Sequence, residues 1–363
     1  MTARFPLLTL AMLGAAADAT FAGAPAEPAA PEITAASTPS RWRFGAAYAP
    51  LVGLKVDFKG LGKFNSPFTA QPLGGGVDYE YEDGFVRVDS ADNLGGQTWN
   101  WGYQDNSQYQ SANGGSVDFS ITNSLSNGSA EEDSNANLGV ELTTYYDMGA
   151  VGIPGLKERG ATWGFRGGLH YARINVENNN LISTDLTTLT DRFNLNGAVA
   201  PGAPYAGSFE GPGPLIDDSP IRSISAGGQG LIAGSRTLDI HLTTLNFGGY
   251  LEVPVTRKFD LLLEAGVSAA VASGSYEFDS YTSVNGVNGT TSQTSAGKDS
   301  GNTVLPGAYL GMGGIYQLTP NWALQASGRF QYMDDLDLGD NGSSAELSFG
   351  SAFVISVGAL YSF

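Results

Sequence analysis

Hydrophobic and polar residues alternate with a period of two through much of the chain after residue 40. Near the end of the sequence the residues at every second position are apolar, namely Phe353, Ile355, Val357, Ala359, Tyr361 and Phe363. Successive side chains of a β-strand point to opposite faces, so this pattern predicts strands whose two faces differ in chemistry. We therefore expect a protein built from β-strands.

The alternation predicts eight strands, at 41–57, 136–147, 161–175, 237–253, 259–275, 303–318, 321–333 and 345–363. Most of them exceed the ~5–6 residues that are usual for strands of soluble proteins. Two further pieces, Val77–Val88 and Val117–Ile121, are strand-like, and ten strands would result if both joined the same sheet. Eight is the favoured number, since Glu80, Glu82 and Asp83 suit an external hairpin better than a lipid-facing strand.

Aromatic residues and loop lengths favour a membrane protein over a soluble sandwich. Trp42, Trp163, Tyr171 and Trp322 mark strand ends, as in an interfacial girdle. Short links such as Pro254–Lys258 alternate with long polar ones, at 178–236, 276–302 and 334–344. The expected fold is all-β, a closed antiparallel up-and-down transmembrane β-barrel with long extracellular loops, the first at about 59–135. A periplasmic β-sandwich is the soluble alternative.

The last strand carries the most specific signal. Its alternating apolar face and its terminal aromatic residue resemble the C-terminal assembly signal of bacterial outer-membrane barrels, carried by Phe353, Ile355, Val357, Tyr361 and Phe363. The layout of strands over 41–363 resembles the small OmpA-type barrel domain family, without a peptidoglycan-binding domain. This resemblance implies insertion by the outer-membrane assembly machinery, with outer-membrane lipid as the second partner.

The first forty residues predict export. Arg4 precedes an apolar run, and small residues follow it, so residues 1–24 are expected to be a signal peptide. Residues 25–40 are rich in Pro and Ala and are expected to form a linker. The expected location is the outer membrane of a Gram-negative-type bacterium, with both chain ends in the periplasm.

The composition excludes several classes of function. Lys and Arg number 18 against 36 Asp and Glu among 363 residues, which gives a net charge of −18 and argues against nucleic-acid binding. The chain has no Cys, so it forms neither disulfides nor thiolate metal sites. Only two His residues are present. Gly accounts for 50 residues, and this high glycine content suits tight turns and a narrow barrel interior.

Charged residues on the polar faces of the predicted strands point into the barrel. An inward charge in a narrow barrel is costly unless it is paired. We therefore expect a lumenal charge network of Glu141, Arg166, Glu252, Glu264 and Arg329. It either fills and fixes the barrel or gates a narrow conduction path, and the first of these is favoured.

Two loop features are candidate ligand sites. Trp99, Trp101 and Tyr103 share one face and could form an aromatic platform for a surface ligand, although packing against the barrel is the simpler interpretation. The stretch 334–346 contains a weak calcium candidate, formed by the acidic residues Asp335, Asp337, Asp340 and Glu346. Apart from this weak possibility, no cofactor is expected.

An enzyme is the remote alternative. Asp239 and His241 share a strand face, and His170 lies on the strand before the long 178–236 link, so a base and its partner are conceivable. No nucleophile motif accompanies them. The sequence therefore predicts a non-catalytic envelope structural or surface-interaction protein, with a narrow porin-like channel as the alternative and an outer-membrane hydrolase as the remote one.

Overall fold

The computed structural model describes residues 41–286 and 289–363. The predicted signal peptide and linker therefore lie outside the described residues. Within the described ranges the only helical segments are two short 3-10 turns, at Asn106–Gln108 and Ala112–Gly114, and no helix is long and apolar enough to span a membrane. The prediction of an all-β, antiparallel fold is confirmed.

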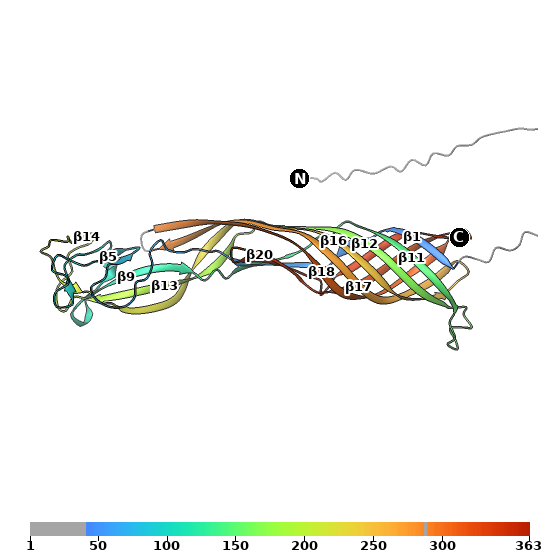
Figure 1. Cartoon of the computed structure of the whole chain (residues 1–363), viewed down its shortest axis with the longest axis horizontal. Helices are drawn as coiled ribbons and strands as arrows, with labels where there is room; N and C mark the ends of the chain where they lie inside the picture. The colour runs from blue at the N-terminus through green and yellow to red at the C-terminus, as the bar shows by residue number, and fades with distance from the viewer. Residues whose placement is uncertain (1–40, 287–288) are drawn as a thin grey trace, which may run out of the picture. The chain divides into compact units, whose positions relative to one another are not determined.

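Eight strands pair antiparallel in a ring (Figure 1). Each has one neighbour on either side, in the order β1, β11, β12, β16, β17, β18, β19 and β22, and β22 pairs again with β1. Their bounds are β1 (Trp42–Tyr48), β11 (Gly139–Ala150), β12 (Thr162–Asn178), β16 (Ile221–Pro254), β17 (Phe259–Gly286), β18 (Gly289–Gln317), β19 (Trp322–Met333) and β22 (Phe353–Ser362). Each of the eight predicted segments overlaps one of these strands.

Three strands continue well beyond the ring, and the long links predicted at 178–236, 276–302 and 334–344 are wrong. The first two contain β13 (Ile182–Asn194) and long paired parts of β16, β17 and β18. The third contains β20 (Leu336–Asp340) and the start of β21 (Ser343–Ser348), which pair with each other. We use the name extension for residues 221–241 of β16, 273–286 of β17 and 289–302 of β18, together with the strands that pack on them. The hydrophobic pattern does not predict these strands because polar side chains occupy the outward positions there.

A second sheet packs inside the extension. It has the order β10 (Gly128–Asp133), β3 (Lys55–Leu61), β21 (Ser343–Ser348) and β20 (Leu336–Asp340). Val56 and Phe58 of β3 belong to the largest buried apolar cluster, together with Ile240 and Phe278 of the long strands. The short strand β2 (Leu51–Val52) pairs with β22 and leads from the ring into this sheet.

The remaining strands form a cap built from residues 64–124 and 182–217. There β9 (Ser116–Ser124) and β8 (Tyr109–Gln110) continue the first sheet from β13. Two smaller groups complete it: β4 (Tyr79–Tyr81), β5 (Gly84–Val86), β7 (Trp101–Tyr103) and β14 (Tyr205–Ala206), and the pair β6 (Gln97–Thr98) with β15 (Ile216–Asp217). Neither of the strand-like pieces 77–88 and 117–121 joins the ring.

Candidate functional site

The interior of the ring holds a network of four buried charges. Arg166 of β12 lies 2.7 Å from Glu141 of β11 and 2.9 Å from Glu264 of β17. Arg329 of β19 approaches the same two carboxylates, at 2.9 Å from Glu141 and 3.7 Å from Glu264. All four side chains are at most 1% exposed, and two positive charges balance two negative ones.

The fifth residue expected in this network, Glu252, lies elsewhere. It pairs at 2.6 Å with Arg43 of β1, whose guanidinium stacks over the rings of Tyr145 and Tyr250 at 5.3 and 5.5 Å. The period of two places Glu252 on the inward face but does not say at which level. Glu252 follows Tyr250 on β16 and lies at the end of the ring, near the short link 254–258. The prediction that Glu252 belongs to the same network as the other four charges is therefore wrong.

Aromatic and amide side chains bridge the interior beside the charges. Tyr145 of β11 accepts a hydrogen bond from Gln325 of β19 at 2.8 Å, although the two strands are not neighbours. Tyr309 of β18 lies beneath both guanidinium groups, 5.7 Å from Arg166 and 5.5 Å from Arg329. Sequence reasoning did not single these residues out, yet the alternation that places Arg166 inward also places Tyr145 and Gln325 there.

Apolar layers lie on both sides of the charged layer. Toward the short links, Tyr145, Tyr250, Leu262, Ile315, Ala323 and Leu360 form one buried cluster from six strands. Toward the extension, Ala270 and Met333 begin the large apolar cluster. A cavity of about 10 Å³ beside Glu141 holds one water molecule at most. Side chains therefore fill the interior in three successive layers.

The outward faces of the strands change character at one level. Within the ring the outward side chains are apolar and exposed, as with Phe165, Leu245, Val267 and Leu310. The last apolar row, aligned by strand pairing, is Tyr171, Thr243, Val271 and Val304, and the next outward row is Arg173, His241, Ser273 and Asn302. We call the outward apolar surface of the ring, up to the first of these rows, the apolar band.

The inward faces also change at this level. Inside the ring they carry buried polar residues such as Arg166, His170 and Glu264 beside the six-residue apolar cluster, whereas in the extension they are mostly apolar, as with Ile174 and Ile240. The same strands thus have an apolar outer face over a partly polar interior in one part of their length, and a polar outer face over a largely apolar interior in the other.

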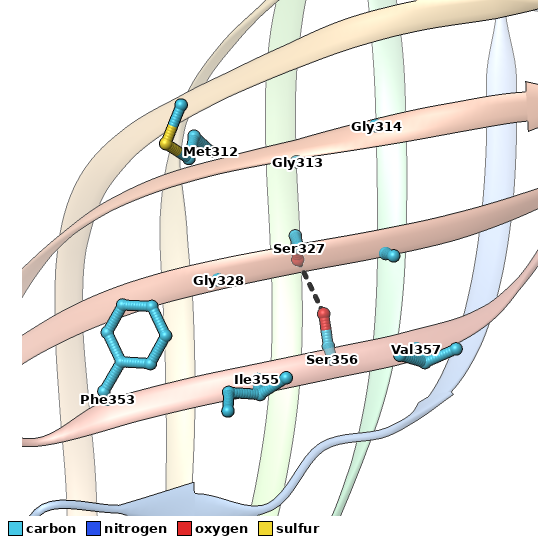
Figure 2. Close-up of a pocket in the computed structure, with 10 residues that line it drawn as sticks. Met312, Gly313, Gly314, Ser327, Gly328, Phe353, Ile355, Ser356 and Val357 are labelled. Carbon is cyan, nitrogen blue, oxygen red and sulfur yellow. Dashed lines mark hydrogen bonds between the residues drawn. The ribbon is translucent and has the colours of Figure 1, made fainter.

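A shallow hollow lies on the apolar band (Figure 2). It measures about 530 Å³ and forms where outward Gly314, Ala326 and Gly328 leave space between Met312 and Phe353. The ring of Phe353 covers Gly328 so closely that a Cβ atom there would lie 2.6 Å from it. The hydroxyls of Ser327 and Ser356 hydrogen-bond to each other at 2.6 Å on the buried side. The hollow suits a hydrocarbon and offers no group for acid–base chemistry.

The C-terminal residues of the predicted assembly signal lie on this band. Phe353, Ile355, Val357 and Phe363 are exposed on the outward face of the last strand and its end. Tyr361 is half-buried and packs against Trp322 and Phe363, with ring centroids 4.9 Å apart in each case.

The structure does not contain the aromatic platform that the sequence suggested. Trp101 and Tyr103 are buried in an aromatic cluster with Tyr81, Phe119 and Phe193. The half-buried Trp99 donates its indole N–H to the carbonyl of Phe209 at 3.0 Å. The shared face of these residues is covered by neighbouring strands of the cap, so it packs as a core and is closed to a ligand.

Three of the four acidic residues of the weak calcium candidate, Asp335, Asp340 and Glu346, are engaged by other groups. Asp335 accepts from the backbone N–H of Phe349, and Asp340 accepts from that of Lys298. Asp337 and Glu346 face each other across the β20–β21 pair, and Glu346 is bound by Lys59. Within residues 41–286 and 289–363, no group of three or more His, Asp or Glu side chains could hold a metal ion.

The residues considered for catalysis do not meet. His170 points inward, is fully buried and donates from Nε2 to the carbonyl of Ala49 at 2.8 Å. His241 lies on the outward face, with Nδ1 2.7 Å from the hydroxyl of Tyr171. Asp239 is bound by Arg173 at 3.0 and 2.6 Å, so it does not orient either histidine.

No family model and no curated protein matches the sequence. Solved structures that resemble it are outer-membrane proteins. Ail of Yersinia pestis, in complex with the heparin analogue sucrose octasulfate, matches 88% of this chain and 99% of its own, at 10% identity and a TM-score of 0.24. A Pseudomonas aeruginosa FadL homologue matches 88% and 90%, at 12% identity and a TM-score of 0.16. The P. putida toluene transporter TodX matches 90% of both chains, at 9% identity and a TM-score of 0.16. These scores are too low to carry an argument, so the function has to be argued from the geometry.

Proposed function

We propose that this chain is an eight-stranded outer-membrane β-barrel that anchors a large surface-exposed β-structure, the extension and its cap, and that it has no catalytic role. The observation that carries this proposal is that the outward faces of the strands change from apolar to polar at one level, where the interior changes from partly polar to largely apolar. Backbone groups in lipid need partners within the protein, and a ring of paired strands supplies them. Outward apolar side chains suit lipid, and outward polar side chains over an apolar core suit water.

The layered interior supports an envelope structural or surface-interaction role over transport. Cross-interior contacts between Glu141 and Arg329, and between Tyr145 and Gln325, tie together strands that are not neighbours. Eight strands give an interior that side chains can fill. The engaged positions of His170, His241 and Asp239 support the absence of catalysis.

The proposed topology predicts which residues are accessible on intact cells. The chain has no Cys, so single cysteines can be introduced without a background. We expect Ser235→Cys, in the extension, to react with a membrane-impermeant maleimide on intact cells. We expect Val255→Cys, in the short link, to react only after the outer membrane is permeabilised. Recovery of the protein in the soluble periplasmic fraction, or the reverse labelling pattern, would contradict the proposal.

The filled interior predicts an absence of conduction. Purified protein in planar lipid bilayers should show no unitary conductance steps above those of protein-free bilayers, because three layers of side chains occupy the interior. A parallel insertion control, such as protease protection of the same protein in vesicles, shows that the barrel is in the membrane. Reproducible unitary steps from inserted wild-type protein would favour the channel alternative.

A further inference from the structure

The beginning of β16 forms a sheet edge that borders only one other strand. Residues 221–226 pair with β13 on one side (Figure 1). Pairing between β16 and β17 begins only at Leu231, so the other side of 221–226 has no strand beside it. Among the described residues, no other backbone hydrogen bond involves this segment. Backbone groups along about 20 Å of strand, at ~3.3 Å per residue, therefore point to an open edge.

The face of this segment that continues the core of the cap is also uncovered. Arg222 lies on that face, because it binds the fully buried Asp191 at 2.8 and 2.7 Å. The period of two places Ile224 on the same face. Its register partner on β13 is Leu189, which packs against the aromatic cluster of the cap. Ile224 itself is 71% exposed, so the apolar core of the cap ends at an open edge.

Other sheet edges among the described residues have features that discourage pairing. At the far end of the same sheet, β8 is only two residues long. The strands at the two ends of the inner sheet carry acidic residues, three in β10 and two in β20. Short strands and charged side chains commonly protect an edge from other chains. Residues 221–226 contain no Lys, Asp, Glu or Pro, and their one charge, on Arg222, is paired with Asp191.

The charge of the cap favours a basic partner over a second copy of this chain. Residues 64–124 and 182–217 contain twelve Asp and Glu against two Arg. A second copy would bring the same excess of negative charge to the edge, and like charges across an interface oppose association. A basic segment is instead attracted to this surface, which also raises its rate of encounter.

We propose that the edge 221–226 binds an extended, basic segment of another protein by adding it as a strand beside β16. Backbone hydrogen bonds to the edge supply affinity, and an apolar side chain of the added strand covers Ile224. This inference deepens the surface-interaction role and rests on the proposed function for placing the edge outside the cell. Strand addition itself needs no membrane, so its failure in detergent leaves the labelling test of Ser235→Cys and Val255→Cys unaffected.

The test adds a short fluorescein-labelled peptide, in which Val alternates with Lys and Thr, to the full-length protein in detergent micelles. Binding is measured by fluorescence anisotropy and by hydrogen–deuterium exchange. We expect saturable binding and slower exchange of the amides within 221–226. The same peptide with Pro at its central positions should not bind, because Pro has no N–H to donate. The peptide with Glu in place of Lys should bind more weakly, because the cap repels it.

A pair of variants tests whether the edge itself is the site. Ile224→Lys puts a charge on the core-facing side of the edge and should weaken binding of the basic peptide by about tenfold or more. Leu94→Lys is the matched control, since it adds the same charge at a cap residue that is 85% exposed and lies off the edge. It should bind the peptide like wild type. Both substitutions replace exposed side chains, so both variants should keep the urea midpoint of wild type.

Several results would overturn strand addition by a basic partner. One is unchanged exchange within 221–226 in the presence of the basic peptide. Another is equally tight binding of that peptide to Ile224→Lys and to wild type. Equal binding of the Glu peptide would reject the selection of a basic segment. A wild-type dimer, detected by light scattering and lost in Ile224→Lys, would assign the edge to a second copy of this chain instead.

Discussion

Replacing Arg166 by Met is expected to destabilise the protein by about 3–5 kcal/mol, the usual range when one partner is removed from a buried ion pair. Arg166 contacts both carboxylates of the network, at 2.7 Å to Glu141 and 2.9 Å to Glu264. Without it, two buried negative charges share Arg329 alone. The free energy of unfolding can be measured by urea titration of protein inserted in lipid vesicles.

A compensating substitution distinguishes charge balance from packing. Adding Glu264→Gln to Arg166→Met leaves one positive and one negative charge, Arg329 and Glu141, 2.9 Å apart. We expect the double variant to recover most of the lost stability, and a double-mutant cycle gives the coupling energy. The exposed pair of Lys55 and Glu131 is the control, since Lys55→Met removes a solvent-screened ion pair and should change the free energy of unfolding far less than Arg166→Met. A single Arg166→Met variant as stable as wild type would show that the network does not hold the barrel together.

The alternation in the sequence predicts the eight ring strands well because lipid-like and interior faces impose opposite preferences at successive positions. It predicts less about the partner of each inward charge. Arg166, Glu141 and Glu264 meet because strand pairing brings them to one level, and Glu252 lies at a different level beside Arg43. A period of two fixes the face of a residue but not the stagger between strands.

The extension was harder to predict for a related reason. Its strands also alternate, with Tyr276 and Phe278 inward and Glu277 and Asp279 outward, but the polar outward face resembles a loop by composition. The burial of Trp101 and Tyr103 could not be inferred either, because strands distant in sequence, such as β14, cover them. In both cases the wrong prediction concerns which face of a strand packs against a segment distant in sequence. The local pattern of polar and apolar residues does not contain that information.

Replacing Leu245 by Arg is expected to cost about 1–4 kcal/mol, because a basic residue on the lipid face of a barrel costs about 2–4 kcal/mol at the midplane and about 0–1 kcal/mol near the interfaces. Leu245 is 62% exposed on β16 and lies within the apolar band. Ser235 is its matched control, because it lies on the same face of the same strand, ten residues away, in the extension. Ser235→Arg should change the free energy of unfolding by no more than about 0.5 kcal/mol, as is usual for a water-exposed position.

The comparison of these two variants shows whether the apolar band faces lipid or water. In a soluble β-sandwich an exposed leucine faces water, so Leu245→Arg would be as neutral as Ser235→Arg. In a membrane barrel only the first substitution forces a charge into hydrocarbon. Urea unfolding of both variants in lipid vesicles measures the difference, and equal stabilities would reject the transmembrane barrel. Because both positions are exposed and neither contacts the charge network, the difference cannot arise from a loss of core packing.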